Sequence, residues 1–191
     1  MSDFFQHKTA IVDVGAMVGE KTKIWHFSHL MSKAKVGANC IIGQNVFIGD
    51  DVIVGNGVKI QNNVSLYTGV EIEEGVFIGP SAVFTNVINP RAFIERKNEF
   101  LSTKVGRGAS IGANATIVCG NSIGEYSIIG AGSVITNAVL NFELVYGNPA
   151  KQKGWVSKAG HKLDFVENKA ICPETGEKYQ LENNAVKFID E

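Results

Sequence analysis

Residues 36–66 read VGANCIIGQNVFIGDDVIVGNGVKIQNNVSL, and within this stretch a large aliphatic residue returns at every sixth position. The same spacing runs without a slip through thirteen hexads, from Val12 to Phe84, and resumes for six more from Val105 to Ile135. Neither an amphipathic helix nor an alternating strand alone produces a strict period of six. Internal repetition on this scale predicts a solenoid.

Two further columns define the repeat. A small residue or valine lies two positions before nearly every large apolar residue, and glycine follows that residue directly in ten of the nineteen hexads. A short strand and a tight turn fit this pattern, because glycine tolerates turn dihedrals. Three hexads then form one coil of eighteen residues, and successive coils stack as parallel strands about 4.8 Å apart. The predicted fold is an all-β solenoid.

Composition narrows the class of protein. The chain has 191 residues, 45% of them hydrophobic, and a net charge of −1, which disfavours a general nucleic-acid or membrane-surface binder. An apolar segment of twenty residues is absent, and the start, MSDFFQHKTA, lacks the pattern of a signal peptide. We therefore expect a cytoplasmic protein without nucleic-acid or membrane partners.

The three cysteines, Cys40, Cys119 and Cys172, form no recognisable framework. Cys40 falls in the small-residue column and is predicted to pack in the core. Cys172, in CPETGEKY, resembles half of a zinc knuckle, but a second Cys-x-x-Cys is missing from the sequence. A turn is the better interpretation, and no metal site is predicted.

One break interrupts the repeat. Phe84 and Val105 lie twenty-one residues apart, three more than three hexads, so we predict an excursion loop at about residues 86–104. The stretch is rich in arginine and lysine, and functional residues concentrate on such loops. The predicted division is a β-helix domain over residues 1–151 and a C-terminal extension over residues 152–191. The extension is expected to hold a short helix or extended segment at 155–162 and a β-hairpin turning at 173–176.

Residues eighteen apart are predicted to stack, which brings polar side chains together. His26, Gln44 and Asn62 share one column, and Asn45 and Asn63 share the next. Asn63 either forms an amide ladder with Asn45 at a turn or contacts a ligand. Gln44 and Asn62 are expected to point outward, which favours ligand contact for them.

The hexapeptide pattern resembles that of the left-handed parallel β-helix acyltransferases, which supplies the expected handedness. Over residues 10–151 the chain is similar to the UDP-2-acetamido-3-amino-2,3-dideoxy-glucuronate N-acetyltransferases. Seven segments carry this resemblance: IWHFSHL (24–30), IGQNVFIG (42–49), KIQNNVSLY (59–67), EEGVFIGPSAVFTNVINPRAFIERK (73–97), GANATIVCG (112–120), IGAGSVI (129–135) and GNPAK (147–151).

The resemblance implies an enzyme that uses acetyl-CoA to acetylate the C3″ amine of a UDP-linked amino-uronic acid, for a lipopolysaccharide O-antigen sugar. It also implies a homotrimer with each active site between adjacent prisms, and no metal. Coenzyme A is then expected along the C-terminal coils, with Lys151 meeting a phosphate of CoA. The backbone positions implied for the pantetheine arm are Gly112, Ala113, Ala131 and Gly132.

The resemblance further places Asn86 beside the reacting amine. An asparagine amide can accept a hydrogen bond from the amine but cannot take its proton at neutral pH, so Asn86 is predicted to orient the amine. His26 and His29 are distant from Asn86 along the predicted axis, and a structural or substrate-contacting role suits them better than that of a base. Arg91 and Arg96 match a carboxylate or a diphosphate, or else pair with Glu95 or Glu99 within the loop.

Three other functions remain as alternatives. An acetyltransferase for another 3-amino or 4-amino nucleotide sugar is the strongest of them, although such enzymes often carry a histidine base. A γ-class carbonic anhydrase would need three histidine ligands, and only His26 and His29 lie within the repeats. A non-enzymatic scaffold would not be expected to break its own repeat with a basic loop.

Overall fold

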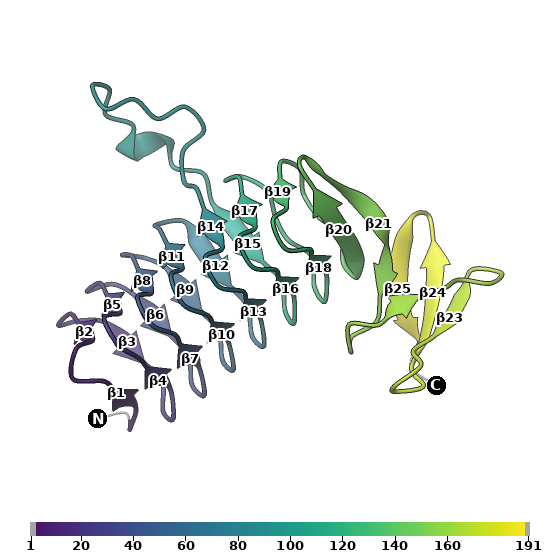
Figure 1. The fold of residues 1–191 in the computed structure, drawn as a ribbon, viewed down its shortest axis with the longest axis horizontal. Helices are drawn as coiled ribbons and strands as arrows, with labels where there is room; N and C mark the ends of the chain where they lie inside the picture. Colours follow the sequence, from purple (N-terminus) through teal and green to yellow (C-terminus); the bar gives the residue numbers. More distant parts are fainter. Residues whose placement is uncertain (1–2, 190–191) are drawn as a thin grey trace.

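The computed structural model describes residues 3–189 and shows a three-sided prism of stacked coils, followed by a small C-terminal sheet (Figure 1). Each side of the prism is formed by short parallel strands of one sheet, and the three sheets are here called A, B and C. Strands pair at an interval of eighteen residues, for example Lys23 with Ile41 and Ile41 with Lys59. The predicted coil length and the stacking of residues eighteen apart are therefore confirmed.

The three prism sheets have the following strands. Sheet A contains β1 (Phe5–Gln6), β4 (Lys23–Ile24), β7 (Ile41–Ile42), β10 (Lys59–Ile60), β13 (Phe77–Ile78), β16 (Ser110–Ile111), β18 (Ile128–Ile129), β20 (Glu143–Gly147), β21 (Ala150–Val156) and β22 (Lys162–Leu163). Sheet B contains β2 (Ile11–Val12), β5 (His29–Leu30), β8 (Phe47–Ile48), β11 (Ser65–Leu66), β14 (Val83–Phe84), β17 (Thr116–Ile117) and β19 (Val134–Ile135). Sheet C contains β3 (Met17–Val18), β6 (Lys35–Val36), β9 (Ile53–Val54), β12 (Val70–Ile72) and β15 (Thr103–Val105).

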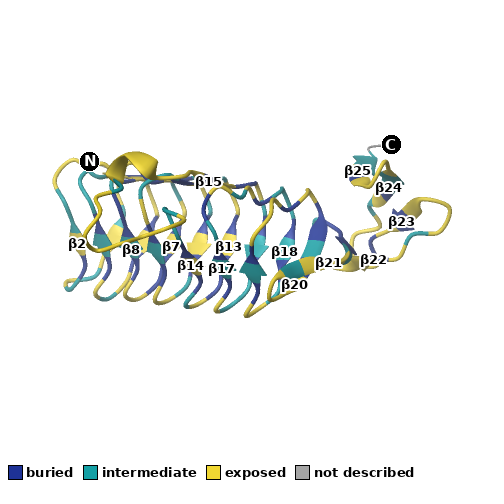
Figure 2. Cartoon of the chain, turned by 90° about the horizontal axis from the view of Figure 1, so that it is seen from above, coloured by how far each residue is buried: buried dark blue, intermediate teal, exposed yellow. Residues whose placement is uncertain are grey.

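The large apolar residues of the repeat fill the prism. Ile24, Ile42, Ile60 and Ile78 are completely buried on sheet A, and Leu30, Ile48 and Leu66 on sheet B. The view from above shows this buried interior running along the whole prism (Figure 2). The small-residue column fits the corners: Cys40 is fully buried there, and its thiol donates to the carbonyl of Gly55 at 3.1 Å.

The break in the repeat is a loop inserted into one coil. β14 pairs with β17, and β12 with β15, at an interval of thirty-three residues in place of eighteen. Figure 1 shows the segment between β14 and β15, which includes the short 3-10 helix η1 (Lys97–Glu99), projecting away from the prism. The predicted end near residue 104 is late, because Thr103 and Lys104 already belong to β15.

The C-terminal part of the chain adds antiparallel structure. β21 folds back on β20 and crosses the expected boundary at residue 151, so the extended form is found up to Val156 in place of a helix. The hairpin is present: β23 (Lys169–Ile171) pairs with β24 (Lys178–Glu182), which pairs in turn with β25 (Ala185–Ile189). A second cluster of buried residues supports this sheet around Tyr179, Trp155 and Phe142.

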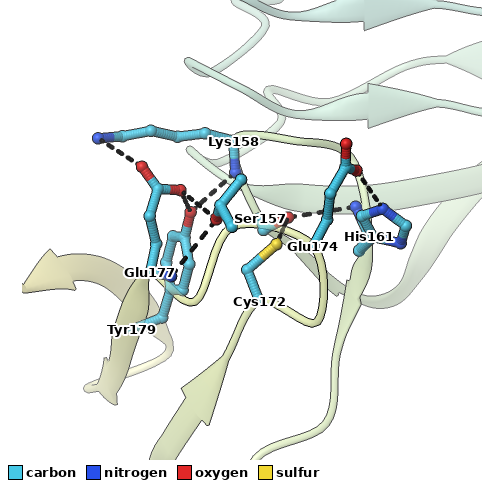
Figure 3. Close-up of polar contacts among 8 residues, drawn as sticks. Ser157, Lys158, His161, Cys172, Glu174, Glu177 and Tyr179 are labelled. Carbon is cyan, nitrogen blue, oxygen red and sulfur yellow. Dashed lines mark hydrogen bonds and ion pairs between the residues drawn. The ribbon is translucent and has the colours of Figure 1, made fainter.

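Two facing turns, 157–161 and 172–177, are held together by polar contacts (Figure 3). The Tyr179 hydroxyl accepts the backbone N–H of Lys158 and donates to the Glu177 carboxylate, at 2.9 and 2.7 Å. Cys172 is hydrogen-bonded to Ser157 at 3.2 Å. Burial raises the pKa of the Cys172 thiol, but hydrogen bonds from Ser157, Thr175 and the backbone outweigh it and lower the pKa to about 7.

Candidate functional site

The corner between sheets A and B, here called the A/B edge, carries most of the predicted binding residues. One column on this edge consists of His7, Trp25, Gly43, Gln61, Gly79, Gly112, Gly130 and Tyr146. The next column consists of Lys8, His26, Gln44, Asn62, Pro80, Ala113 and Ala131. Apart from Gly43, the residues of both columns are large up to Asn62. Beyond Asn62 they are glycine, alanine or proline until Tyr146.

The N-terminal half of the A/B edge is hollowed. His26, Gln44 and Asn62 line a cavity of about 280 Å³ together with Trp25 and Gln61. The Asn62 Oδ1 atom accepts the backbone N–H of Gln44 at 2.8 Å, which fixes the orientation of the Asn62 amide. The column predicted from the sequence is thus real, and its side chains face one shared space.

Asn63 lies in the neighbouring column and forms the amide ladder that the sequence left open. The Asn45 side-chain amide donates to Asn63 Oδ1 at 3.1 Å. Asn45 and Asn63 both adopt positive φ, at 56° and 62°, as asparagine tolerates in a tight turn. This structural role accounts for Asn63 without a ligand.

The C-terminal half of the A/B edge carries only small side chains, and this strip is here called the trough. Gly79, Gly112 and Gly130 stack in one column, with no side chain larger than a proline ring in the adjacent one. From Gln61 to Tyr146 the trough spans about 19 Å at the usual strand spacing. The glycines are required by the packing, because a Cβ atom on Gly112 would lie 2.5 Å from the Ala131 nitrogen.

The backbone of the trough offers hydrogen-bond donors. At equivalent turn positions elsewhere, a side chain from the following coil accepts the free N–H, as Asn56 does for Ala38 and Asn62 for Gln44. Within residues 3–189, the N–H groups of Ala113 and Ala131 have no such acceptor. Two of the four predicted backbone positions thus carry N–H groups free to bind an amide carbonyl.

Basic side chains stand at the far end of the trough. Lys151 lies opposite Tyr146 in the β20–β21 pair, and the Lys153 ammonium lies 5.1 Å from the centre of the Tyr146 ring. Both lysines are exposed, and among the described residues neither forms an ion pair. Lys151 also borders a small cavity of about 180 Å³ at the end of the prism.

Asn86 lies on a different edge, between sheets B and C, where the loop leaves the prism. Its carbonyl accepts the N–H of Leu101, which closes the base of the loop at 2.9 Å. Its side-chain amide has no hydrogen-bond partner within the described part of the chain. Asn86 belongs to the same coil as Gly79 and Pro80, so it lies at the height where the trough begins.

The two loop arginines differ in their surroundings. Arg96 donates to both carboxylate oxygens of Glu99, at 2.9 and 2.8 Å, as one of the predicted alternatives required. Arg91 is exposed and donates only to the Pro90 carbonyl at 3.0 Å, without a carboxylate partner in residues 3–189. Of the two, Arg91 keeps its guanidinium available for an anion.

His29 projects from the outer face of sheet B, between the two edges. Its Nε2 atom lies 3.1 Å from an Asp13 carboxylate oxygen, and its ring contacts Phe47 edge-on. His29 and His26 therefore stand on different surfaces. Neither lies near Asn86 on the same prism, since three coils separate His29 from it.

The described residues contain no cluster of side chains that could bind a metal ion. Within residues 3–189, three or more histidine, cysteine or acidic side chains never gather closely enough to hold an ion. The same segment forms no helix with the length and apolarity that a membrane crossing requires.

Two features of the site escaped the sequence analysis. The first is Trp25, which borders the hollow but was not predicted as a site residue. The signal for it was a large aromatic residue followed eighteen positions later by Gly43, which leaves one face of the ring uncovered. The free N–H groups of Ala113 and Ala131 were also readable, because asparagine or aspartate is absent eighteen residues after each of them.

Comparison with known proteins identifies the fold and the family of this chain. The family described as "Bacterial transferase hexapeptide (six repeats)" matches residues 15–50, 51–86 and 102–137, and so skips the loop. The chain is 49% identical over 185 residues to the dTDP-3-amino-3,6-dideoxy-α-D-galactopyranose 3-N-acetyltransferase of Aneurinibacillus thermoaerophilus. That alignment covers 97% of this chain and 95% of the relative.

Solved structures share the fold at low identity. LpxA of Bacteroides fragilis, a UDP-N-acetylglucosamine acyltransferase, is 17% identical with a TM-score of 0.67, over 81% of this chain and 62% of LpxA. PerB of Caulobacter crescentus, solved with CoA and GDP-perosamine, is 20% identical with a TM-score of 0.52, over 80% and 58%. The chain thus spans about three fifths of these proteins. The predicted left-handed parallel β-helix is confirmed, and the chain belongs to the bacterial hexapeptide-repeat transferase family.

Proposed function

We propose that this protein is an acetyl-CoA-dependent N-acetyltransferase that acts on the amine of a nucleotide-linked 3-amino sugar. The continuous A/B edge carries the proposal: the trough, with free N–H donors and terminal lysines, meets a hollow lined by polar side chains. The 49% identical relative, an N-acetyltransferase for a dTDP-3-amino sugar, supports the same reaction.

Coenzyme A occupies the trough in this proposal. Its extended pantetheine arm has two amides, and their carbonyls match the free N–H groups of Ala113 and Ala131. The absence of side chains at Gly112 and Gly132 lets the arm lie against the backbone. Lys151 and Lys153 then face the phosphates at the far end, and the thioester reaches the coil of Gly79 and Pro80.

The sugar amine and Asn86 meet the thioester across a subunit interface. On one prism, sheet B separates Asn86 from Pro80 by six residues, up to about 20 Å of extended backbone. In a homotrimer with parallel prism axes, Asn86 of one copy lies at the same height as Pro80 of the next. The loop favours such an assembly, because Ile88, Phe93 and Ile94 are 59, 84 and 42% exposed within a single chain.

The chemistry then follows from positioning. The neutral amine attacks the thioester carbonyl, a C–N bond forms, the C–S bond breaks, and the proton leaves with the thiolate or to water. Holding the two reactants in line supplies a large part of the rate enhancement. Asn86 accepts a hydrogen bond from the amine and aims its lone pair, but it does not remove the proton. His26 contacts the nucleotide sugar, and His29 is held by Asp13 as part of the sheet B surface.

Two substrates fit this reaction. The first is a UDP-linked 2-acetamido-3-amino-2,3-dideoxy-glucuronic acid, whose uronate meets the guanidinium of Arg91, which has no carboxylate partner within residues 3–189. The second is a neutral 3-amino-3,6-dideoxy sugar on dTDP, the substrate named for the 49% identical relative. The rates of acetylation of both sugars by the native chain and by Arg91→Gln distinguish the two substrates. The substitution should slow acetylation of the uronate sugar only.

The reaction is tested by mass spectrometry of each amino sugar incubated with acetyl-CoA and the full chain. Ala131→Leu should raise KM for acetyl-CoA at least tenfold, because the leucine side chain fills the exposed trough without entering the core. Ala38→Leu, at the matching turn position between sheets C and A, is the control and should leave KM unchanged. Acetylation of neither sugar, or an unchanged KM in Ala131→Leu, would refute the proposal.

Asn86→Ala tests the orienting role separately. We expect kcat to fall by one to three orders of magnitude while KM for acetyl-CoA stays constant, since the amine is bound but poorly aimed. The pH dependence of kcat should keep its shape, because an asparagine does not titrate. Full turnover in this variant would remove Asn86 from the mechanism but leave the trough assignment standing.

A further inference from the structure

The hollow on the A/B edge has an aromatic wall formed by Trp25 and His26. The planes of the two rings are nearly parallel, at 7° to each other with 6.1 Å between their centres, and the pair is here called the Trp25–His26 shelf. Both are backed by residues of the preceding coil: Phe5 lies 5.4 Å from Trp25, and His7 stacks on His26 at 3.6 Å. One face of this shelf is therefore covered by protein.

The other face of the shelf opens into the hollow, because the following coil places Gly43 next to Trp25. Trp25 remains 39% exposed, an unusual fraction for a tryptophan that already packs on a neighbour. Gln44, Gln61 and Asn62 also line the hollow, and their amide groups both donate and accept hydrogen bonds. At about 280 Å³ the space suits one ring and its pentose, since complete ligand sites are usually larger.

Charge around the hollow has a single sign. Lys8 lies in the column of His26, and Lys23 and Lys59 project from sheet A on either side of Ile41. Aspartate and glutamate are absent from segments 5–9, 23–28, 41–46, 59–64 and 77–81. None of the three lysines forms an ion pair within residues 3–189, whereas Lys104 and Arg107 on the other side of the prism are both paired.

We infer that this hollow is the nucleotide subsite and that it takes the pyrimidine base of a nucleoside diphosphate sugar on the Trp25–His26 shelf. The inference rests on the proposed function and adds to it the place and class of the base. The amides of Gln44, Gln61 and Asn62 match the alternating carbonyls and N–H of a uracil or thymine edge. Lys59 lies on the strand that leads to Gln61 and Asn62, where it faces the diphosphate.

The arrangement orders the two substrates end to end. The shelf lies three coils, about 14 Å, from Gly79 and Pro80. A diphosphate and a pyranose ring fill that interval, so the amine arrives where the thioester ends. The nucleotide sugar therefore occupies the N-terminal half of the edge, and coenzyme A the C-terminal half.

Binding of nucleotides without any sugar tests the subsite apart from the reaction. The chain has two tryptophans, Trp25 at the hollow and Trp155 in the buried C-terminal cluster, so quenching of fluorescence by UDP or dTDP reports on Trp25. Trp25→Ala should weaken the affinity for UDP, measured by calorimetry, about tenfold, which is equivalent to about 1.4 kcal/mol. Trp25→Phe should recover most of the affinity, because a phenyl ring also stacks.

Two further variants sharpen the result. Lys59→Met should weaken the affinity for UDP several-fold but leave the affinity for uridine unchanged, because only UDP carries phosphates. Phe27→Ala removes a 62% exposed aromatic ring that does not line the hollow, and should bind UDP as the native chain does. GDP should bind the native chain more weakly than UDP.

The outcomes separate the two ideas. If UDP or dTDP binds and Trp25→Ala leaves its affinity unchanged, the subsite is wrong while the proposed function stands. If GDP binds as tightly as UDP, the assignment to pyrimidines is wrong. If neither UDP nor dTDP binds the native chain, both the subsite and the proposed nucleotide-sugar substrate fail.

Discussion

The prism and the C-terminal sheet bury their apolar side chains in different ways. Inside the prism, Ile60 packs between the equivalent residues of two neighbouring coils, each eighteen positions away. In the C-terminal sheet, Tyr179 packs on Phe142 and Phe188 and uses its hydroxyl to tie down Lys158 and Glu177. These contacts come from four segments with no common spacing.

The difference shows which kind of stability a repeat can encode. A solenoid core is a nearest-neighbour structure, so one rule applied to every coil is sufficient. The C-terminal sheet depends on particular pairs of residues, and each pair has to be correct on its own. Substitutions should therefore act through lost apolar packing in the prism and through lost polar contacts in the C-terminal sheet.

The largest effect is expected from a cavity in the prism. Ile60→Ala removes a side chain with no exposure to solvent, and should lower the free energy of unfolding by about 3–4 kcal/mol. Urea denaturation measures the loss. Ile53→Ala, at a residue 43% exposed on the outer face, is the matched control and should cost under about 1 kcal/mol. Equal losses in the two variants would contradict a core carried by the inward column.

The second-largest loss of stability is expected from removing a buried polar contact in the C-terminal sheet. Tyr179→Phe keeps the ring but deletes the hydroxyl, which leaves the Lys158 N–H without its acceptor, and should cost about 2 kcal/mol. Hydrogen exchange should accelerate in β23–β25 more than in the prism strands. Tyr146→Phe serves as the control, because the Tyr146 side chain is exposed. Uniform acceleration along the whole chain would mean that the two regions unfold as one unit.

The smallest effect is expected on the prism surface. Lys104 lies 2.7 Å from Glu73, and Lys104→Met should lower the free energy of unfolding only slightly at pH 7, because the Lys104 side chain is exposed and solvent screens the pair. The hydrogen bond from Lys104, aided by the Arg107 N–H, lowers the pKa of Glu73. A depressed carboxyl pKa stabilises the fold above its unfolded value of about 4 and loses that effect as pH falls through the folded pKa.

Urea titrations at pH 7 and pH 3 check this prediction. The difference between the native chain and Lys104→Met should be smaller at pH 3 than at pH 7, because Glu73 gains a proton as the pH falls through its lowered pKa. The difference should also shrink at 1 M salt. A difference that persists unchanged at pH 3 would assign the effect of Lys104 to packing of its alkyl chain.

The prism could be predicted from the sequence because its rule is local and repeated. The column of His26, Gln44 and Asn62 followed from counting eighteen residues, and so did the stacking of Asn45 and Asn63, although the count did not decide between an amide ladder and ligand contact. The end of the loop was predicted too late, although Thr103 occupies the small-residue column two positions before Val105 and so already marked the resumed repeat. The turns around Ser157 and Cys172 follow no period, so their pairing depends on contacts that spacing does not encode.

The inserted loop has a consequence for how this fold diversifies. β14 is held by β11 and β17, and β15 by β12, so both anchor strands keep their hydrogen bonds whatever segment joins them. Loop-closure entropy grows only logarithmically, and doubling the segment costs about 0.6 kcal/mol. The loop at this corner can therefore change in length and sequence while the coils on either side keep their structure, so that different loops can supply different recognition residues.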